Sequence, residues 1–413
     1  MYKVRVILYS IEKSLQEWEQ KVKKQIVNNY GSFDLTFVKG NGATLTATNG
    51  RKYIDFIAGI GVNCLGHNYK PLVKAIARQA KEEIHISNYY FSDEGIQFAT
   101  ELLARTGFEH GYFGNSGAEA NEAAIKLARK YGFLTGGEKK HTIITLESSF
   151  HGRTLATLTA TGQDKFHPDC FAPYPQGFKT IKANDFDALS TCFTDDVAAI
   201  LLECVQGEGG VNLIDKEWAK AVHDAAHKAG ALVMADEVQT GVGRTGTYLA
   251  SEWLGLEPDV VTLAKGIAGG VPMGACLFRG AASDVFVAGD HQSTFAGNPL
   301  ACAAALTVLH TMTPEFLENV SKKGDYIRQT IRSWSLPIVK DVRGKGLMIG
   351  TQIDGSIKPF DIEVKCLEEG LCTTTAGSDV IRFLPPLNIS QKEIDAGLAI
   401  YKRVLEEFCK NAN

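Results

Sequence analysis

The chain has 413 residues, of which 45% are hydrophobic and 22% charged, with a formal net charge of -4 at pH 7. This length allows two or three domains with a large buried core. The small negative charge gives no reason to expect nucleic acid or an anionic membrane as a partner. Nine cysteines are dispersed without a CxxC pair, which is typical of a reducing cytoplasm and argues against a disulfide framework or a zinc site.

The N-terminal segment contains no predicted membrane span. Residues 1–9, MYKVRVILY, are too short and too interrupted by charge, and no signal-peptide cleavage site follows, so we treat residues 1–11 as an extension of unknown use. Apolar residues at helical spacing predict an amphipathic helix over residues 11–27, which Asn29-Tyr30-Gly31 ends. Alternating short runs over residues 35–56 predict a small antiparallel sheet.

Two helices are expected over residues 70–83 and 93–106, and another begins in the segment NSGAEANEAAIKLARKY. Small and polar residues open this segment, so the backbone N–H groups of its first turn can face an anion. Gly117 and Ala118 would allow a phosphate to approach closely, and Ser116 would offer a hydroxyl. Taken alone, the motif would favour ordinary N-capping by Asn115 or Ser116, but it lies one strand-and-helix unit from further site candidates.

Short apolar runs predict buried strands of a mostly parallel sheet: HTIITLE, VAAILLE, ALVMA and VVTLA. Asp236 and Lys265 follow the last two runs at their carboxyl ends, which is where α/β sheets bind ligands and hold catalytic residues. An amine can form an imine with an aldehyde cofactor, and a carboxylate can keep a pyridine nitrogen protonated. The pair therefore indicates pyridoxal 5'-phosphate (PLP) chemistry, although a capping aspartate and a solvated lysine are the plain alternative.

The segment DEVQTGVGRTG followed by LAKG resembles the class III, ornithine-type aminotransferases, and the resemblance extends from about Asn29 to the C-terminus. It implies the α/β fold type I of PLP-dependent transferases. A large PLP-binding domain, residues 67–310, would hold a mostly parallel, seven-stranded sheet between helices. A smaller α+β domain would combine residues 1–66 with residues 311–413.

The resemblance also implies roles for particular residues. Lys265 would bind the cofactor and carry the proton, and Asp236 would protonate the ring nitrogen. His151 is then expected to be structural, because Lys265 can move the proton itself, and Glu203 should lie near Asp236. The remaining cofactor-binding residues would be Ser116, Gly117, Ala118, Phe150, Val238, Gln239 and, from the neighbouring subunit of a homodimer, Thr294. The substrate would meet Arg153, Glu208, Arg382 and Tyr30.

Among these enzymes, the GxxVNxLGH form of residues 59–67 favours those that transfer the terminal amino group of N2-acetyl-L-ornithine to 2-oxoglutarate. Ornithine, succinylornithine and 4-aminobutyrate stay open as donors, because loops outside the motifs decide the far end of the pocket. Two positions depart from the family pattern. Cys204 replaces a usual proline, and Ala296 replaces a glycine of TFGGNP, which a loop tolerates where φ is negative.

Other classes of protein share parts of these patterns. Gly241, Gly243 and Gly246 form a GxGxxG, but DEVQT separates it from the strand and VVTLAKG ends in lysine, which argues against a nicotinamide dehydrogenase. His223 and His227 in HDAAH lack the glutamate and third ligand of a metalloprotease, so no metal is expected. An aminomutase, racemase or decarboxylase stays open, because fold and cofactor do not settle chemistry. The intact set of site residues argues against a binding-only relative.

Overall fold

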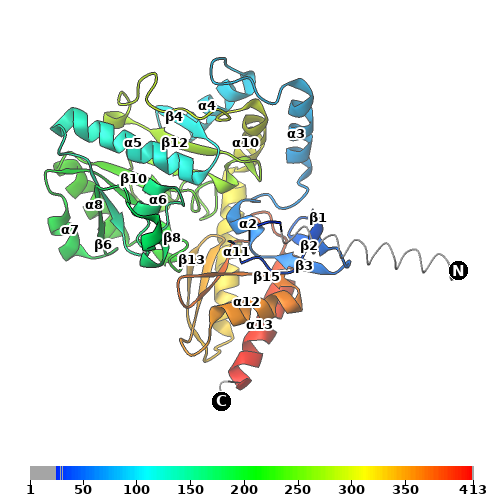
Figure 1. The fold of residues 1–413 in the computed structure, drawn as a ribbon. Coiled ribbons are helices and arrows are strands. Elements are labelled where there is room, and N and C mark those ends of the chain that lie inside the picture. Colours follow the sequence, from blue (N-terminus) through cyan, green and yellow to red (C-terminus); the bar gives the residue numbers. More distant parts are fainter. Residues whose placement is uncertain (1–24, 28, 30, 412–413) are drawn as a thin grey trace.

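The computed structural model describes residues 25–27, 29 and 31–411. Tyr30 and most of the predicted helix over residues 11–27 lie outside the described residues. Figure 1 shows a large sheet flanked by helices in the middle of the sequence, with elements from both ends of the chain gathered beside it. The carboxyl edge of the large sheet is the feature that positions the candidate site.

The large sheet has seven strands and a single antiparallel member. Its order is β4-β12-β11-β10-β7-β5-β6, and β12 runs antiparallel to both β4 and β11. The predicted fold, with a mostly parallel seven-stranded sheet, is therefore confirmed. The strands are β4 (His110–Gly114), β5 (Thr142–Leu146), β6 (Phe178–Ile181), β7 (Val197–Leu202), β10 (Leu232–Asp236), β11 (Val260–Leu263) and β12 (Gly274–Phe278).

The central strands are buried on both faces, as their continuous apolar runs predict. In β10, Leu232 and Met234 belong to the same hydrophobic cluster as α5 (Gly117–Gly136). Val233, between them, belongs to the cluster that contains the apolar face of α8 (Lys216–Lys228). Successive side chains of a strand point to opposite faces, and both faces of these strands are covered. Polar side chains can therefore reach a cavity only at the strand ends.

Helices α3 (Lys70–Glu82) and α4 (Asp93–Thr106) match their predicted ranges to within one residue. Both pack against α10 (Pro299–Thr311). The shorter elements connect the sheet and carry the loops of the site. They are α2 (Ala58–Gly61), α6 (Leu155–Ala160), α7 (Phe186–Cys192), α9 (Ala250–Leu254), β8 (Val205–Gln206), β9 (Asn212–Leu213) and the 3₁₀ turns η1 (Asp164–Phe166), η2 (Asp169–Phe171), η3 (Lys265–Ala268) and η4 (Gly280–Ala282).

Two smaller sheets lie beside the large one, and one of them joins the two ends of the chain. The predicted antiparallel strands β1, β2 and β3 are present, and β15 pairs with β3 in parallel, aligning Leu371 with Ile54. The other sheet has the order β13-β14-β17-β16. The elements are β1 (Phe37–Asn41), β2 (Thr44–Ala47), β3 (Lys52–Asp55), β13 (Val339–Lys345), β14 (Met348–Ile353), β15 (Leu371–Cys372), β16 (Thr374–Ala376), β17 (Val380–Phe383), α11 (Pro314–Ser333) and α12 (Pro359–Glu369).

The final helix, α13 (Gln391–Asn411), begins directly after Ser390. The Ser390 hydroxyl accepts from the Glu393 backbone N–H at 3.3 Å, and the Glu393 carboxylate accepts from the Ser390 N–H at 3.0 Å. The division into residues 1–66, 67–310 and 311–413 stays a prediction. No single helix in the described part of the chain is long and apolar enough to cross a membrane; α10 and α11 reach that length and composition only as a pair bent by 75°.

Candidate active site

A cavity of about 430 Å³ opens at the carboxyl ends of β7, β10 and β11. Its volume is within the range of sites for small molecules and cofactors, about 300–1,000 Å³. Nine of the residues that the sequence predicted for the site line this one cavity: Ser116, Gly117, Ala118, Phe150, Arg153, Asp236, Val238, Gln239 and Lys265. They come from four separate stretches of sequence, which the sheet brings together.

Asp236 is the last residue of β10 and is 3% exposed. Its Oδ2 accepts from Asn121 Nδ2 at 2.8 Å and lies 2.7 Å from His151 Nδ1, and its Oδ1 accepts from the Val238 N–H at 3.0 Å. Because a carboxylate oxygen only accepts, His151 carries its proton on Nδ1 in this arrangement. Three donors therefore hold the carboxylate in one orientation inside the cavity.

Asn121 connects this carboxylate to the neighbouring strand. It is 1% exposed, and its Oδ1 accepts from Thr262 Oγ1 of β11 at 2.7 Å, while its amide also donates to the His151 carbonyl at 2.7 Å. Asn121 is a site residue that was not predicted from the sequence. The signal that could have revealed it is a single amide on the buried, alanine-rich face of α5, where a polar side chain requires partners.

Lys265 directly follows β11 and opens the turn η3. Its backbone has a φ of 49°, a left-handed conformation that costs roughly 1–3 kcal/mol for a residue with a side chain and persists only where the surroundings enforce it. Burial lowers the pKa of the Lys265 amine, and the negative charge of Asp236 opposes this shift. A lowered pKa increases the neutral fraction of the amine, which is the form that reacts with an aldehyde.

Glu203 follows β7 and is 4% exposed. Its Oε1 accepts from the Phe150 N–H at 2.9 Å and its Oε2 from the Gly207 N–H at 3.0 Å. Burial raises the pKa of Glu203 to about 7, and the neighbouring His151 acts in the opposite direction. Glu203 therefore fixes the backbone of the loop that carries Phe150, a role that its position in the sequence did not reveal.

The N-terminus of α5 forms the wall opposite Lys265. Ser116 is its N-cap, and the Ser116 hydroxyl accepts from the Glu119 N–H at 3.2 Å. A Cβ added to Gly117 would lie 2.6 Å from Val238 Cγ1, so only glycine allows this close approach. A helix N-terminus, a partly buried lysine and a carboxylate around one cavity match the phosphate, aldehyde and ring nitrogen of PLP.

Arg382, in β17, and Glu208 do not line the cavity, but Arg382 contacts Gln239, which does. Arg382 is 2% exposed, and its guanidinium donates to Glu208 Oε2 at 3.1 Å and to Gln239 Oε1 at 3.3 Å. The Glu208 side chain is 31% exposed, so one partner of this ion pair is fixed and the other faces solvent. Gln239, which lines the cavity, connects the pair to it. Within the described residues, the buried Nε of Arg382 has no hydrogen-bond acceptor.

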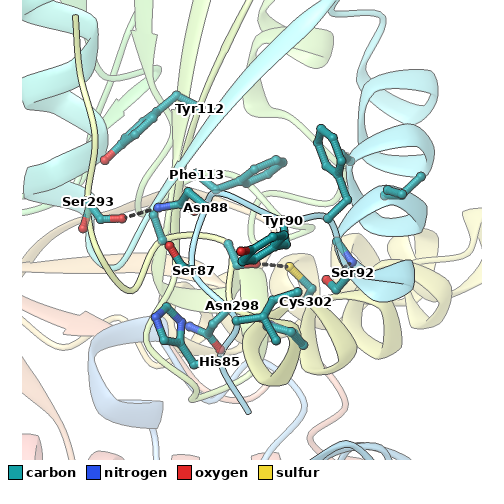
Figure 2. A pocket seen from close by; sticks show the side chains of 18 of the residues that line it. His85, Ser87, Asn88, Tyr90, Ser92, Tyr112, Phe113, Ser293, Asn298 and Cys302 are labelled. Atoms are coloured by element: carbon teal, nitrogen blue, oxygen red, sulfur yellow. Dashed lines mark hydrogen bonds between the residues drawn. The ribbon is translucent and has the colours of Figure 1, made fainter. Parts of the chain in front are cut away.

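Thr294 does not line this cavity and is exposed. It follows Ser293, whose hydroxyl accepts from Asn115 Nδ2 at 2.7 Å. Ala296, in the same loop, does not have a positive φ. This is the condition under which the loop was expected to tolerate alanine in place of glycine. A second cavity, of about 530 Å³, is shown in Figure 2 between this loop, β4 and residues 85–100, and it contains none of the predicted site residues.

The structure also bears on the rival patterns. Gly243 and Gly246 have φ of 84° and 94° in a loop, and the next helix, α9, starts at Ala250, so these glycines do not open a helix as a dinucleotide site requires. The His223 and His227 rings lie 4.1 Å apart. Nowhere in the described part of the chain do three His, Cys, Asp or Glu side chains gather as a metal site.

Comparison with known sequences identifies clear relatives. The family model "Aminotransferase class-III" matches residues 26–405. Acetylornithine aminotransferase from Caldanaerobacter subterraneus subsp. tengcongensis is 45% identical over 388 residues, which are 93% of this chain and 98% of that protein. Acetylornithine aminotransferase from Methanocaldococcus jannaschii is 42% identical over 400 residues, which are 96% of this chain and 100% of that protein.

Solved structures give the same result. Ornithine aminotransferase from Toxoplasma gondii ME49 superposes with a TM-score of 0.92 at 29% identity, covering 97% of this chain and 98% of that one. N-acetylornithine aminotransferase from Stenotrophomonas maltophilia K279a has a TM-score of 0.82 at 34% identity, covering 93% and 99%. Another Toxoplasma gondii structure, with a TM-score of 0.90 at 30% identity over 98% and 99% of the chains, is described with partial occupancy of PLP at the active site.

The network around Asp236 predicts a graded loss of stability. Asn121→Leu removes three hydrogen bonds and leaves the His151 carbonyl and the Thr262 hydroxyl without a partner, and we expect it to lower the free energy of unfolding by roughly 3–5 kcal/mol. Thr262→Val is the matched control, because it removes one donor with little change in shape, and it should cost only about 1–2 kcal/mol. Urea unfolding of both variants measures the difference, and equal losses would contradict a central role for Asn121.

Proposed function

The chain belongs to the class III aminotransferases, which are PLP-dependent enzymes, and we propose from this premise that it transfers the terminal amino group of N2-acetyl-L-ornithine to 2-oxoglutarate. The products are N-acetyl-L-glutamate 5-semialdehyde and L-glutamate, a step of arginine biosynthesis. The observation that carries the proposal is the ion pair of Arg382 with Glu208 beside a cavity whose rim holds Arg153. Glu208 neutralises Arg382, and Arg153 is available to bind a carboxylate of the substrate.

When bound, PLP supplies an aldehyde carbon that accepts the amino group and a pyridine ring that withdraws electrons from the adjacent C–H bond. Asp236, held by its three donors, would keep the ring nitrogen protonated. The first turn of α5, from Ser116 to Ala118, would bind the phosphate. Phe150 and Val238, which line the cavity, would hold the ring, and Gln239 would donate a hydrogen bond to it.

Lys265 has two tasks in this proposal. Its Nζ would hold the cofactor, and the same nitrogen would carry the proton during the reaction. The lowered pKa serves both tasks, because a neutral amine can attack an aldehyde and can accept a proton near neutral pH. His151 keeps a supporting role through its contact with the Asp236 carboxylate.

The two substrates differ at the carbon that reacts, and Glu208 and Arg382 account for that difference. Acetylornithine carries no carboxylate on its reacting carbon, so Glu208 covers Arg382 and spares a buried, unpaired charge. The carboxylate beside the keto group of 2-oxoglutarate takes the place of Glu208, whose partly exposed side chain can turn away to solvent. Arg153 holds the other carboxylate in both half-reactions, and a substrate contact by Tyr30 completes the proposed site.

The amino donor is tested by a screen of half-reactions. Purified PLP-bound protein is mixed with acetylornithine, succinylornithine, ornithine or 4-aminobutyrate at equal concentration, and the cofactor absorbance is followed by stopped flow. Acetylornithine should react fastest. Lys265→Ala is the control and should lose activity by many orders of magnitude, because its proton carrier is absent. A faster reaction with another amine would reassign the donor.

Glu208→Ala tests whether the ion pair exchanges partners. It leaves Arg382 permanently uncovered, so the rate with acetylornithine should fall about tenfold, the equivalent of ~1.4 kcal/mol, while the rate with glutamate is kept or raised. Single-turnover rates of the two half-reactions in this one variant measure the effect. A fixed structural pair predicts parallel losses in both, together with a lower melting temperature.

We also propose a cytoplasmic homodimer in which Thr294 contacts the phosphate bound by the partner subunit. Tyr89, Tyr90 and Phe91 are 83%, 73% and 91% exposed beside the cavity of Figure 2, a surface that a second copy would cover. Asn88 donates to the Ser293 carbonyl at 2.6 Å and holds the Thr294 loop against this surface. All nine cysteines are unpaired, in keeping with a reducing compartment.

Assembly is tested by sedimentation of the active holoenzyme, which should be a dimer at assay concentration. Thr294→Ala should weaken PLP retention by about tenfold or more, since a hydrogen bond to a charged group is worth ~1.5–3 kcal/mol. Thr294→Ser keeps the hydroxyl and should retain PLP. A fully active monomer would exclude a contribution from the partner subunit.

A further inference from the structure

We infer that Phe166 positions the Arg153 guanidinium and thereby determines how strongly the site binds the substrate's distal carboxylate. The inference rests on the proposed function in one respect, that Arg153 is the group that meets this carboxylate. Phe166 does not line the cavity and is the last residue of the turn η1. Its role is therefore to position another residue, and it does not touch the reacting atoms.

The geometry is a cluster of two cations and two rings, in which Lys165 Nζ also lies 4.8 Å from the centroid of the Phe166 ring. Arg153 Cζ lies 4.1 Å from the centroid of the Phe166 ring and 5.6 Å from that of Phe150. The two rings meet edge to face, with centroids 5.7 Å apart and an interplanar angle of 74°. Phe150 lines the cavity, so this cluster connects the rim of the site to the surface predicted to contact the cofactor ring.

Within the described residues, Arg153 is held by the two rings alone, and the Phe166 ring is the nearer of them. The side chain is exposed, and among residues 31–411 no hydrogen bond or ion pair to the protein holds it. A guanidinium on a flexible stem loses rotamer freedom when it binds a carboxylate, and a ring that already restrains it reduces that loss. Because the contact with Phe166 uses the π system of the ring, the N–H groups of Arg153 need no protein acceptor and can serve the substrate.

The position of the Phe166 ring is set by the fold. The Phe166 N–H donates to the Gln163 carbonyl at 3.0 Å, and Gln163 Nε2 donates to the Ser149 carbonyl at 3.0 Å, next to Phe150. On the other side, His167 Nε2 lies 2.6 Å from the Leu158 carbonyl of α6. The turn is thus attached on both flanks to the segment that carries Phe150 and Arg153, so the ring is in place before a substrate binds.

The test compares substrates that differ only in the distal carboxylate. Phe166→Leu should lower kcat/KM about tenfold for acetylornithine and for 2-oxoglutarate, mainly through KM, since an exposed to partly buried cation–π contact has about this weight. N-acetyl-1,4-diaminobutane and 2-oxopentanoate lack that carboxylate and should react with unchanged efficiency. Phe166→Tyr keeps the ring and should restore wild-type KM. Phe171→Leu removes an exposed ring from the same loop and serves as the matched control.

A second comparison separates an action through Arg153 from a general disturbance of the loop. In an Arg153→Ala background, Phe166→Leu should have no further effect on KM for 2-oxoglutarate. Equal losses for substrates with and without the carboxylate, or additive losses in the double variant, would overturn the inference. If the wild type does not react with acetylornithine, the donor assignment fails, while 2-oxoglutarate and 2-oxopentanoate still test Phe166.

Discussion

A carboxylate can be buried only where the surrounding protein supplies hydrogen-bond donors, and the arrangement around Asp236 follows from this constraint. Its donors come from the long helix α5, the loop after β5 and the backbone two residues further along the chain. Satisfying one side chain therefore fixes the relative positions of α5, β10 and β11. The same contacts place the helix N-terminus, Lys265 and Phe150 around one cavity.

A second constraint connects the cavity to the smaller sheets. Arg244, in the loop after β10, is 2% exposed and donates to the carbonyls of Leu347 at 3.0 Å and Pro385 at 2.6 Å. Burial lowers its pKa to about 10, which still leaves it charged at neutral pH. These bonds attach the Asp236 loop to the hairpin of β13 and β14 and to the segment after β17. The distance between Arg382 and the cavity is thereby defined.

Much of this arrangement could be predicted from local sequence. The range of α4 was predicted to the residue, and β10 was placed correctly because an unbroken apolar run that ends in Asp236 has few other structures available. Local signals could mark Asn121 as a buried amide that needs partners, but they could not identify those partners or the role of Phe166, because the contacts are tertiary. Asn121 meets Asp236 across 115 residues of sequence, and neither residue type predicts the other. Thr294 lies outside the cavity of its own chain, so the role proposed for it depends on a surface that one chain does not contain.

The pairing of β3 with β15 has a consequence for the order in which the chain can fold. Leu371 aligns with Ile54, so this sheet is completed by residues more than 300 positions apart. During synthesis from the N-terminus, one edge of β3 stays unpaired until β15 has been synthesised, which happens after the strands of the large sheet. An open strand edge is a template for pairing with other chains. The β3 edge must therefore be protected during translation. The speed at which the middle of the chain is synthesised sets how long this edge stays exposed.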